Sequence, residues 1–370
     1  MADLLRNSHR KTRFPAPDVI SLASGDPGFA TPAHIAEALS AAVAGGHTHY
    51  AEPYGDLQLR AAIVDEIKRR RGADFEIDEV VITHGATGAL AAAIVACIEP
   101  GDHVLIPDPT YSLYADEVWI AGAEPVFLPL RPDFHLDLDV LEGAAGGARA
   151  IVLCTPCNPT GAVLRREELV AVAQLAERHD LLVFSDEVYD SIVYDGVEFT
   201  SVLEIPELAQ RLVYVQSFSK KYAMTGWRLG YLAAPRPIAQ AAARLHFALH
   251  GPLNAAVQRA GLAALTTPDD SQERFRVEYQ DRRELVREYL ESVPGVVVSV
   301  PEGGFHALVR YPLPIDSEEM MERCLAAGVA VSAGIEYGPH GEGLLRVSFG
   351  EGGSALQEGL ARLRRALAAP

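Results

Sequence analysis

The sequence of 370 residues is short of cysteine, tryptophan and positive charge. It contains four cysteines and two tryptophans, and 50 acidic residues outnumber 32 lysines and arginines, which gives a formal net charge of −18. So few thiols do not support a disulfide framework, and the negative charge argues against binding to nucleic acid or to an anionic membrane surface. No apolar run approaches the ~20 residues of a membrane-spanning helix, and the first residues lack the pattern of a secretion signal. We therefore expect a cytoplasmic protein that binds neither membrane nor nucleic acid.

Two of the cysteines form a Cys-x-x-Cys pair, Cys154 and Cys157. This spacing occurs in redox dithiols and in half of a zinc site, but a zinc site needs a second pair. Cys97 and Cys324 stand far away in the sequence. We favour a structural interpretation, with Cys154 buried at a strand end and Cys157 in a loop.

What the sequence does contain is an alternation of short apolar runs with helical patterns. The runs that we expect to be strands are 80–83, 103–107, 125–128, 150–154, 181–185 and 212–216. The helical patterns include 33–44, 57–71, 86–97 and 167–178. Continuous apolar strands that alternate with helices are typical of an α/β fold, with a mostly parallel central sheet and helices on both of its faces.

The pattern of expected helices and strands changes after about residue 270. A long charged helix at 269–291 precedes shorter elements, with strands expected at 296–300, 307–309, 330–331 and 344–349 and helices at 317–326 and 354–368. This pattern predicts a smaller α+β domain. We expect residues 1–45 to form an N-terminal arm and part of the small domain, 46–275 the large domain, and 276–370 the rest of the small domain.

Polar residues follow five of the strands expected in the large domain. Ligands of such sheets bind beyond the carboxyl ends of the strands, so these residues are candidates for chemistry. Ala86 and Thr87 open a helix whose free amides could bind a phosphate, although Thr87 could also be a simple cap. Tyr111 could stack on a heteroaromatic ring or pack at the edge of the core.

The next two strand ends carry an amide and a carboxylate. Asn158 lies in a rigid turn between two prolines, which is also ordinary turn chemistry. Asp186 could hold a pyridine nitrogen protonated or cap a helix, and Tyr189 lies three residues further on.

The most informative segment follows the fifth strand and runs Ser217-Phe218-Ser219-Lys220-Lys221-Tyr222-Ala223-Met224-Thr225-Gly226-Trp227-Arg228. A lysine amine forms a Schiff base with an aldehyde, and an arginine binds a phosphate through two parallel hydrogen bonds. Pyridoxal 5'-phosphate carries both groups. Lys220-Lys221 alone could be a solvated pair, but chance does not readily place such residues after five successive strands.

Taken together, these residues resemble those of the fold-type I pyridoxal-phosphate enzymes, specifically the class I/II aminotransferases. The resemblance extends from Ser24-Gly25-Asp26-Pro27 to Arg346-Val347-Ser348-Phe349-Gly350. It implies that the protein transfers an amino group between an L-α-amino acid and a 2-oxo acid, in amino-acid metabolism or biosynthesis. It also implies a homodimer with shared active sites.

The resemblance assigns roles around the cofactor ring. Lys220, rather than Lys221, forms the Schiff base and moves the substrate proton. Asp186 pairs with the ring nitrogen. Tyr189 and Asn158 donate hydrogen bonds to the ring oxygen, and so tune the acidity of the Schiff base.

The resemblance also implies which residues bind the cofactor phosphate and the substrate carboxylate. The phosphate is bound by two hydroxyls, a guanidinium and two backbone amides, from Ser217, Ser219, Arg228, Ala86 and Thr87. Tyr111 stacks on the ring face. Arg346 binds the substrate carboxylate, helped by Asn158 and the backbone at Gly25. Tyr50 reaches the phosphate of the other subunit.

Three segments depart from the family pattern: Gly85-Ala86-Thr87-Gly88, Glu336-Tyr337-Gly338, and 246–254 with its two histidines. They leave open a lyase, a β/γ-replacement or a carbon–carbon bond-forming enzyme with the same cofactor. The acidic charge and the complete set of site residues argue against a non-enzymatic regulator. A dicarboxylate substrate would need a second cation; for the candidates Arg13, His246 and His250 we favour a surface or packing role.

Overall fold

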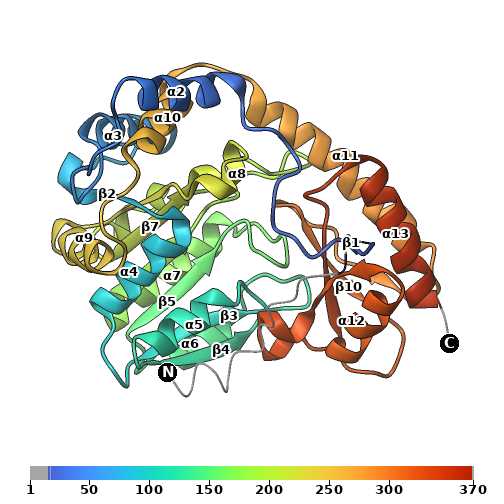
Figure 1. Ribbon diagram of the computed structural model, residues 1–370. Coiled ribbons are helices and arrows are strands. Elements are labelled where there is room, and N and C mark those ends of the chain that lie inside the picture. The colour runs from blue at the N-terminus through green and yellow to red at the C-terminus, as the bar shows by residue number, and fades with distance from the viewer. Residues whose placement is uncertain (1–15, 17, 369–370) are drawn as a thin grey trace.

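The computed structural model describes residue 16 and residues 18–368. Two bodies lie side by side, the larger built on a seven-stranded sheet and the smaller on a four-stranded one (Figure 1). Arg13, considered above as a second cation, lies outside the described residues. Over the described part of the chain, no helix combines the length and the apolar character that crossing a membrane requires.

The large sheet has the strand order β2-β8-β7-β6-β5-β3-β4. Its strands in chain order are β2 (Val80–Thr83), β3 (His103–Asp108), β4 (Glu124–Pro129), β5 (Ala150–Cys154), β6 (Leu182–Asp186), β7 (Leu212–Ser217) and β8 (Gly230–Ala233). Only β8 runs antiparallel to its neighbours. The other six strands therefore point the same way, and their carboxyl ends meet at one edge of the sheet.

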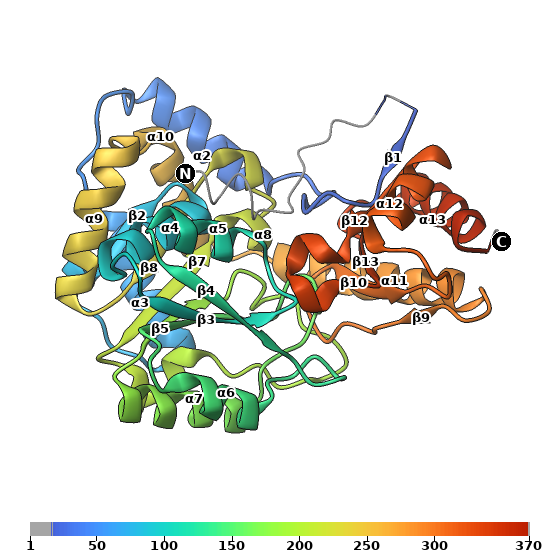
Figure 2. The same cartoon turned by 90° about the horizontal axis from the view of Figure 1, so that it is seen from below.

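Helices cover both faces of this sheet. Figure 2 shows two of them on one side, α6 (Leu138–Ala145) and α7 (Arg166–His179), and two on the other, α4 (Gly85–Cys97) and α5 (Leu113–Ile120). The helix α3 (Leu57–Arg71) shares the apolar core of α7, and α9 (Arg236–His250) shares that of α4. The strands β5 and β7 are buried along their whole length. This burial on both faces explains why their sequences are continuously apolar.

The small body has its own core. Its antiparallel sheet has the order β12-β13-β10-β9. The strands are β9 (Val297–Val298), β10 (His306–Arg310), β12 (Ser332–Ala333) and β13 (Leu344–Ser348). Three helices share a core with this sheet: α11 (Ser271–Glu291), α12 (Ser317–Ala326) and α13 (Gly353–Ala368). Asp316 caps the start of α12, because its side chain accepts a hydrogen bond of 2.8 Å from the backbone amide of Glu319.

The segment before α3 contributes to both bodies. Strand β1 (Ile20–Ser21) pairs in parallel with β11 (Val329–Ala330) of the small body. The helix α2 (Ala33–Ala44) instead packs against α10 (Ala255–Thr266) of the large one. The exact domain limits at residues 45 and 275 stay a prediction.

The predicted fold class is confirmed, and several element boundaries need correction. The helices expected at 33–44, 57–71 and 317–326 have those limits. The strand expected at 181–185 is shifted to Leu182–Asp186, and the one at 296–300 is shortened to Val297–Val298. The antiparallel strand β8 was not expected, because its four residues continue directly from the lysine and arginine segment without a turn signal.

Candidate active site

A cavity of about 1050 Å³ lies where the two bodies meet. Twelve of the predicted site residues line it: Gly25, Ala86, Thr87, Tyr111, Asn158, Asp186, Tyr189, Ser217, Ser219, Lys220, Arg228 and Arg346. The large body contributes strand ends, and Arg346 comes from β13 of the small body. Residues separated by up to 321 positions therefore share one site.

Lys220 lies in α8 (Phe218–Lys221), the short helix directly after β7. Its Nζ donates a hydrogen bond of 2.5 Å to the carbonyl of Gly25. The pKa of this amine is lowered to about 8, chiefly by burial and also by the positive charges of Arg228 and Arg346, while the negative charges of Asp26 and Asp186 oppose the shift. Close to neutral pH, a substantial fraction of the amine is therefore uncharged and nucleophilic.

Lys221 has a different environment from that of its neighbour. Its side chain is buried, its Nζ lies 3.0 Å from a carboxylate oxygen of Asp190, and it does not line the cavity. Asp190 also pairs with Arg71 at 3.1 Å. Lys221 thus belongs to a buried ionic cluster, and of the two lysines only Lys220 can meet a ligand in the cavity.

Asp186 ends β6 and is almost completely buried. The hydroxyl of Tyr114 donates to its Oδ2 at 2.9 Å, and the amide of Val188 donates to its Oδ1 at 3.1 Å. Burial raises the pKa of the carboxyl to about 6, although these hydrogen bonds and the charge of Lys220 oppose the rise. A buried carboxylate of this kind favours a cationic partner, such as a protonated ring nitrogen.

A second group of residues lines the cavity at the first turn of α4. It consists of the guanidinium of Arg228 and the hydroxyls of Ser217 and Ser219. Gly85 has φ +72°, and a Cβ atom there would lie 2.8 Å from Nη2 of Arg228. Only glycine therefore leaves room for the guanidinium beside the helix start. The hydroxyls of Ser217 and Ser219 lie 2.8 Å apart. Unsatisfied helix amides with a fixed cation are a typical phosphate site.

Arg346 is buried and lines the same cavity as Lys220. Its Nη1 donates to Oδ1 of Asn158 at 3.3 Å, its Nη2 donates to the carbonyl of Ala23, and its Nε has no partner among the described residues. The ring of Tyr337 lies beneath it, with the guanidinium carbon 4.9 Å from the ring centroid. A buried guanidinium with an unused donor is suited to bind a carboxylate.

Three further residues were missed by the sequence reasoning. Tyr114 supports Asp186, as described above. Glu117 lines the cavity one helical turn later, with both carboxylate oxygens buried and unpartnered, and burial raises its pKa well above the usual value. His306 is buried, and burial lowers its pKa, as do the charges of Arg346 and Lys220. The spacing of Tyr111, Tyr114 and Glu117 at every third residue was the available signal.

Tyr50 is the one predicted site residue outside the cavity, and 94% of its surface is exposed. His246 and His250 do not line the cavity either, so neither offers the second cation considered for a dicarboxylate. Cys154 ends β5 and Cys157 lies in the loop that follows, as expected, and both thiols are buried.

Comparison with known proteins agrees with this geometry. Residues 17–363 match the family model described as aminotransferase class I and II. The chain is 36% identical to an aspartate aminotransferase of Pyrococcus horikoshii, over 95% of this chain and 91% of that protein. It is 35% identical to aromatic-amino-acid aminotransferase 2 of Thermococcus litoralis, over 94% and 92%. The solved structure of an aromatic aminotransferase from Pyrococcus horikoshii superposes with a TM-score of 0.93 at 35% identity, covering 99% of this chain and 98% of that one.

Proposed function

The chain belongs to the class I and II aminotransferase family and transfers an amino group between an amino acid and a 2-oxo acid, and we propose that Lys220 is its reactive amine. Enzymes of this family use pyridoxal 5'-phosphate. The observation that carries the proposal is the cavity itself, in which a lysine of lowered pKa, a buried carboxylate and two guanidinium groups converge.

The residues of the cavity fit the cofactor. The phosphate would be held by Ser217, Ser219, Arg228 and the amides of Ala86 and Thr87, and the bare Cα of Gly85 leaves room for the Arg228 guanidinium beside them. Asp186 would pair with the ring nitrogen, Tyr111 would cover the ring face, and Tyr189 and Asn158 would donate to the ring oxygen. Each of these groups lines the cavity, which supports the assignment.

When bound, the cofactor supplies an aldehyde carbon for the amino nitrogen and a ring that withdraws electrons from the substrate α-carbon. Asp186 keeps a proton on the ring nitrogen, because its buried charge is stabilised by a cation. The neutral Nζ of Lys220 would accept the proton from the α-carbon and deliver it to the carbon that receives the amino nitrogen, a general-base role that contributes ~10²–10⁴-fold. Arg346 and Asn158 fix the substrate carboxylate, and so direct the α-hydrogen toward Lys220.

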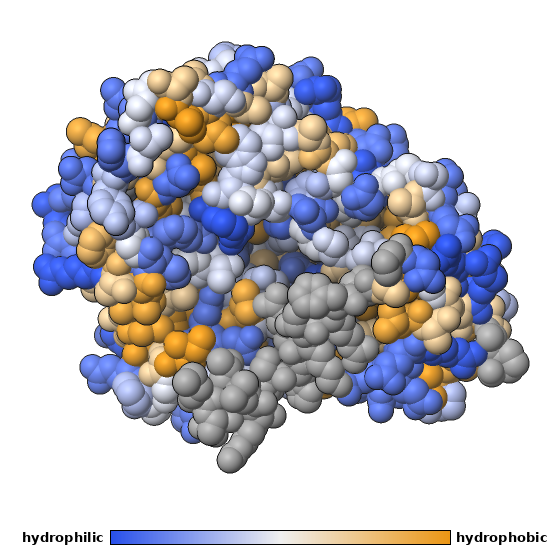
Figure 3. All heavy atoms as spheres, in the orientation of Figure 1, coloured by the Kyte–Doolittle hydropathy of each residue, from blue (hydrophilic) through white to orange (hydrophobic). Residues whose placement is uncertain are grey.

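We also propose a homodimer in which Tyr50 contacts the phosphate of the partner subunit. Its 94% exposure supports a contact outside its own chain. Other exposed apolar side chains include Val43, Ile120, Phe247 and Leu249. Apolar surface gathers over α4 on the face drawn in Figure 3. Domain limits at 45 and 275 and a cytoplasmic role in amino-acid biosynthesis belong to the same proposal.

Borohydride reduction of the cofactor-loaded enzyme tests the assignment of the lysine. Reduction fixes a Schiff base as a stable amine, and peptide mass spectrometry then locates the pyridoxyl group. We expect the pyridoxyl group on Lys220 in the wild type and no pyridoxyl group in Lys220→Ala. The control variant Lys68→Ala, which removes an exposed lysine, should carry the group on Lys220 as the wild type does. A pyridoxyl group on Lys221 would overturn the assignment. A donor screen with aspartate and aromatic amino acids, the substrates named for the relatives, then defines the substrate.

A further inference from the structure

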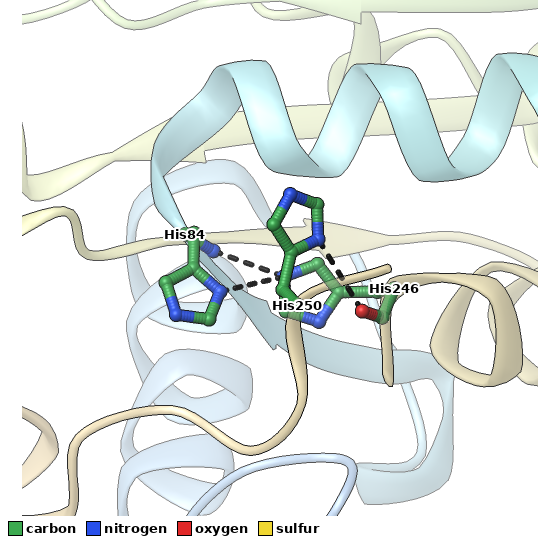
Figure 4. Close-up of side chains that lie close together, drawn as sticks. All are labelled: His84, His246 and His250. Carbon is green, nitrogen blue, oxygen red and sulfur yellow. Dashed lines mark hydrogen bonds between the residues drawn. The ribbon is translucent and has the colours of Figure 1, made fainter. Parts of the chain in front are cut away.

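Three histidines meet outside the active-site cavity. His246 and His250 lie four residues apart at the end of α9, and His84 directly precedes α4 (Figure 4). One ring nitrogen from each of the three lies within 4.8 Å of the others. In the described part of the chain, this is the one group of at least three histidine, cysteine or acidic side chains close enough to hold a metal ion. The proposed function uses none of them.

The geometry of the three rings suits one ion. Nδ1 of His84 and Nε2 of His246 face each other at 3.1 Å. Two nitrogens bound to one tetrahedral Zn²⁺ at 2.0–2.1 Å lie about 3.3 Å apart. Two histidines at positions i and i+4 of a helix are a known arrangement for zinc. The ring of His250 is exposed and can turn toward the other two, since its one hydrogen bond joins Nδ1 to the carbonyl of His246 at 3.3 Å.

The chemical state of the cluster also suits a cation. His246 is fully buried, its Nδ1 has no hydrogen-bond partner, and burial lowers its pKa to about 4, with the charges of His84 and His250 acting in the same direction. Burial likewise lowers the pKa of His84. Metal binds the neutral form of imidazole, which burial favours in both rings. Neutral imidazoles favour Zn²⁺ and neighbouring transition metals over Mg²⁺ or Ca²⁺.

We propose that His84, His246 and His250 bind one Zn²⁺ ion through one nitrogen each, with water in the fourth position. The ion replaces the contact between His84 and His246, together with the 3.1 Å hydrogen bond from the His84 amide to the same nitrogen. Because that bond is lost, we expect an affinity of the order of micromolar rather than nanomolar. The ion would tie the end of α9 to the start of α4, whose first turn lines the phosphate end of the cavity.

The experiment uses untagged, cofactor-loaded protein freed of metal by a chelator and then titrated with ZnCl₂ in a calorimeter. We expect one Zn²⁺ per chain in the wild type and in the control His103→Ala, which alters an exposed histidine outside the cluster. His250→Ala removes an exposed ligand without opening the core and should weaken binding at least about tenfold, as should His84→Gln. Co²⁺ at the same site should give the visible absorption of a tetrahedral complex.

Two outcomes would overturn the proposal. One is no binding by the wild type at a tenfold excess of Zn²⁺, which would mean that the three rings only pack together. The other is equal binding by the wild type, His250→Ala and His84→Gln, which would place the ion elsewhere, for example on the cofactor. Circular dichroism of each variant confirms that it is folded, so a loss of Zn²⁺ binding is due to the loss of the histidine side chain.

Discussion

Lys220 should titrate far below an ordinary lysine in the cofactor-free enzyme. Burial, together with Arg228 and Arg346, lowers its pKa from 10.5 to about 8. At pH 7.5 the uncharged fraction is then about 24%, against about 0.1% for an unperturbed amine. The structure therefore predicts a roughly 200-fold larger population of reactive amine at this one position.

Competitive carbamylation by dilute cyanate measures this difference. Peptide mass spectrometry follows the rate at each lysine as the pH is raised, and the inflection of the rate gives the pKa whatever the accessibility of the site. Lys68 is an internal reference, because its exposed amine pairs with Asp74 and has a raised pKa. Arg346→Gln should move the inflection of Lys220 upward, because it removes a positive charge, and Asp26→Asn should move it downward.

The inflection for wild-type Lys220 is expected near pH 8. An inflection near 10.5 would refute the reasoning, because burial would then not be sufficient to make the amine available. Unchanged inflections in both variants would also contradict it, since they would mean that the nearby charges do not act on the lysine.

Three further predictions concern the substrate, the partner subunit and stability. Arg346→Gln should raise the KM for the amino acid about 100-fold in steady-state kinetics, because a charged hydrogen-bonded contact is worth ~1.5–3 kcal/mol. A fall in kcat that is larger than the rise in KM would contradict this. Tyr50→Phe should weaken cofactor binding by about tenfold in equilibrium dialysis, whereas an unchanged affinity or a monomeric mass in light scattering would remove the proposed contact between subunits. The pKa of His135 is raised from 6.5 to about 9 by hydrogen bonds to Glu168 and Glu302, so its contribution is full below pH 6.5 and is lost as the pH rises through 9. The free energy of unfolding should fall by up to about 3 kcal/mol over that range in urea titrations, and this slope should disappear in His135→Gln.

Much of the fold follows from periodicity. Helices such as α2 and α12 were predictable because their apolar spacing and flanking residues agree. The five parallel strands with polar ends were predictable because both faces of β5 and β7 are buried, which leaves a continuous apolar run. β8 was not predictable, because four residues between an arginine and a proline-rich segment carry no signal of their own.

Some residues of the candidate site could be predicted from the sequence and others could not. Residues at strand ends, such as Asp186 and Lys220, follow from topology, since parallel strands bring their carboxyl ends together. Glu117 and His306 could not be found in this way, because neither follows the carboxyl end of a strand: Glu117 lies in α5, where only its spacing from Tyr111 and Tyr114 gives a signal, and His306 begins β10 and is recognisable only by its burial without a partner. The contact of His84 with His246 joins residues 162 positions apart, and only the packing of α9 on α4 brings them together.

A single-turnover experiment tests the central claim most directly. The cofactor-loaded enzyme is mixed with an amino acid found in the donor screen, with no 2-oxo acid as acceptor. We predict one equivalent of the corresponding 2-oxo acid per active site, no ammonia, renewed turnover when a 2-oxo acid is added, and no product from Lys220→Ala. Sustained release of ammonia without an acceptor, or the same burst from Lys220→Ala, would contradict an aminotransferase that uses Lys220.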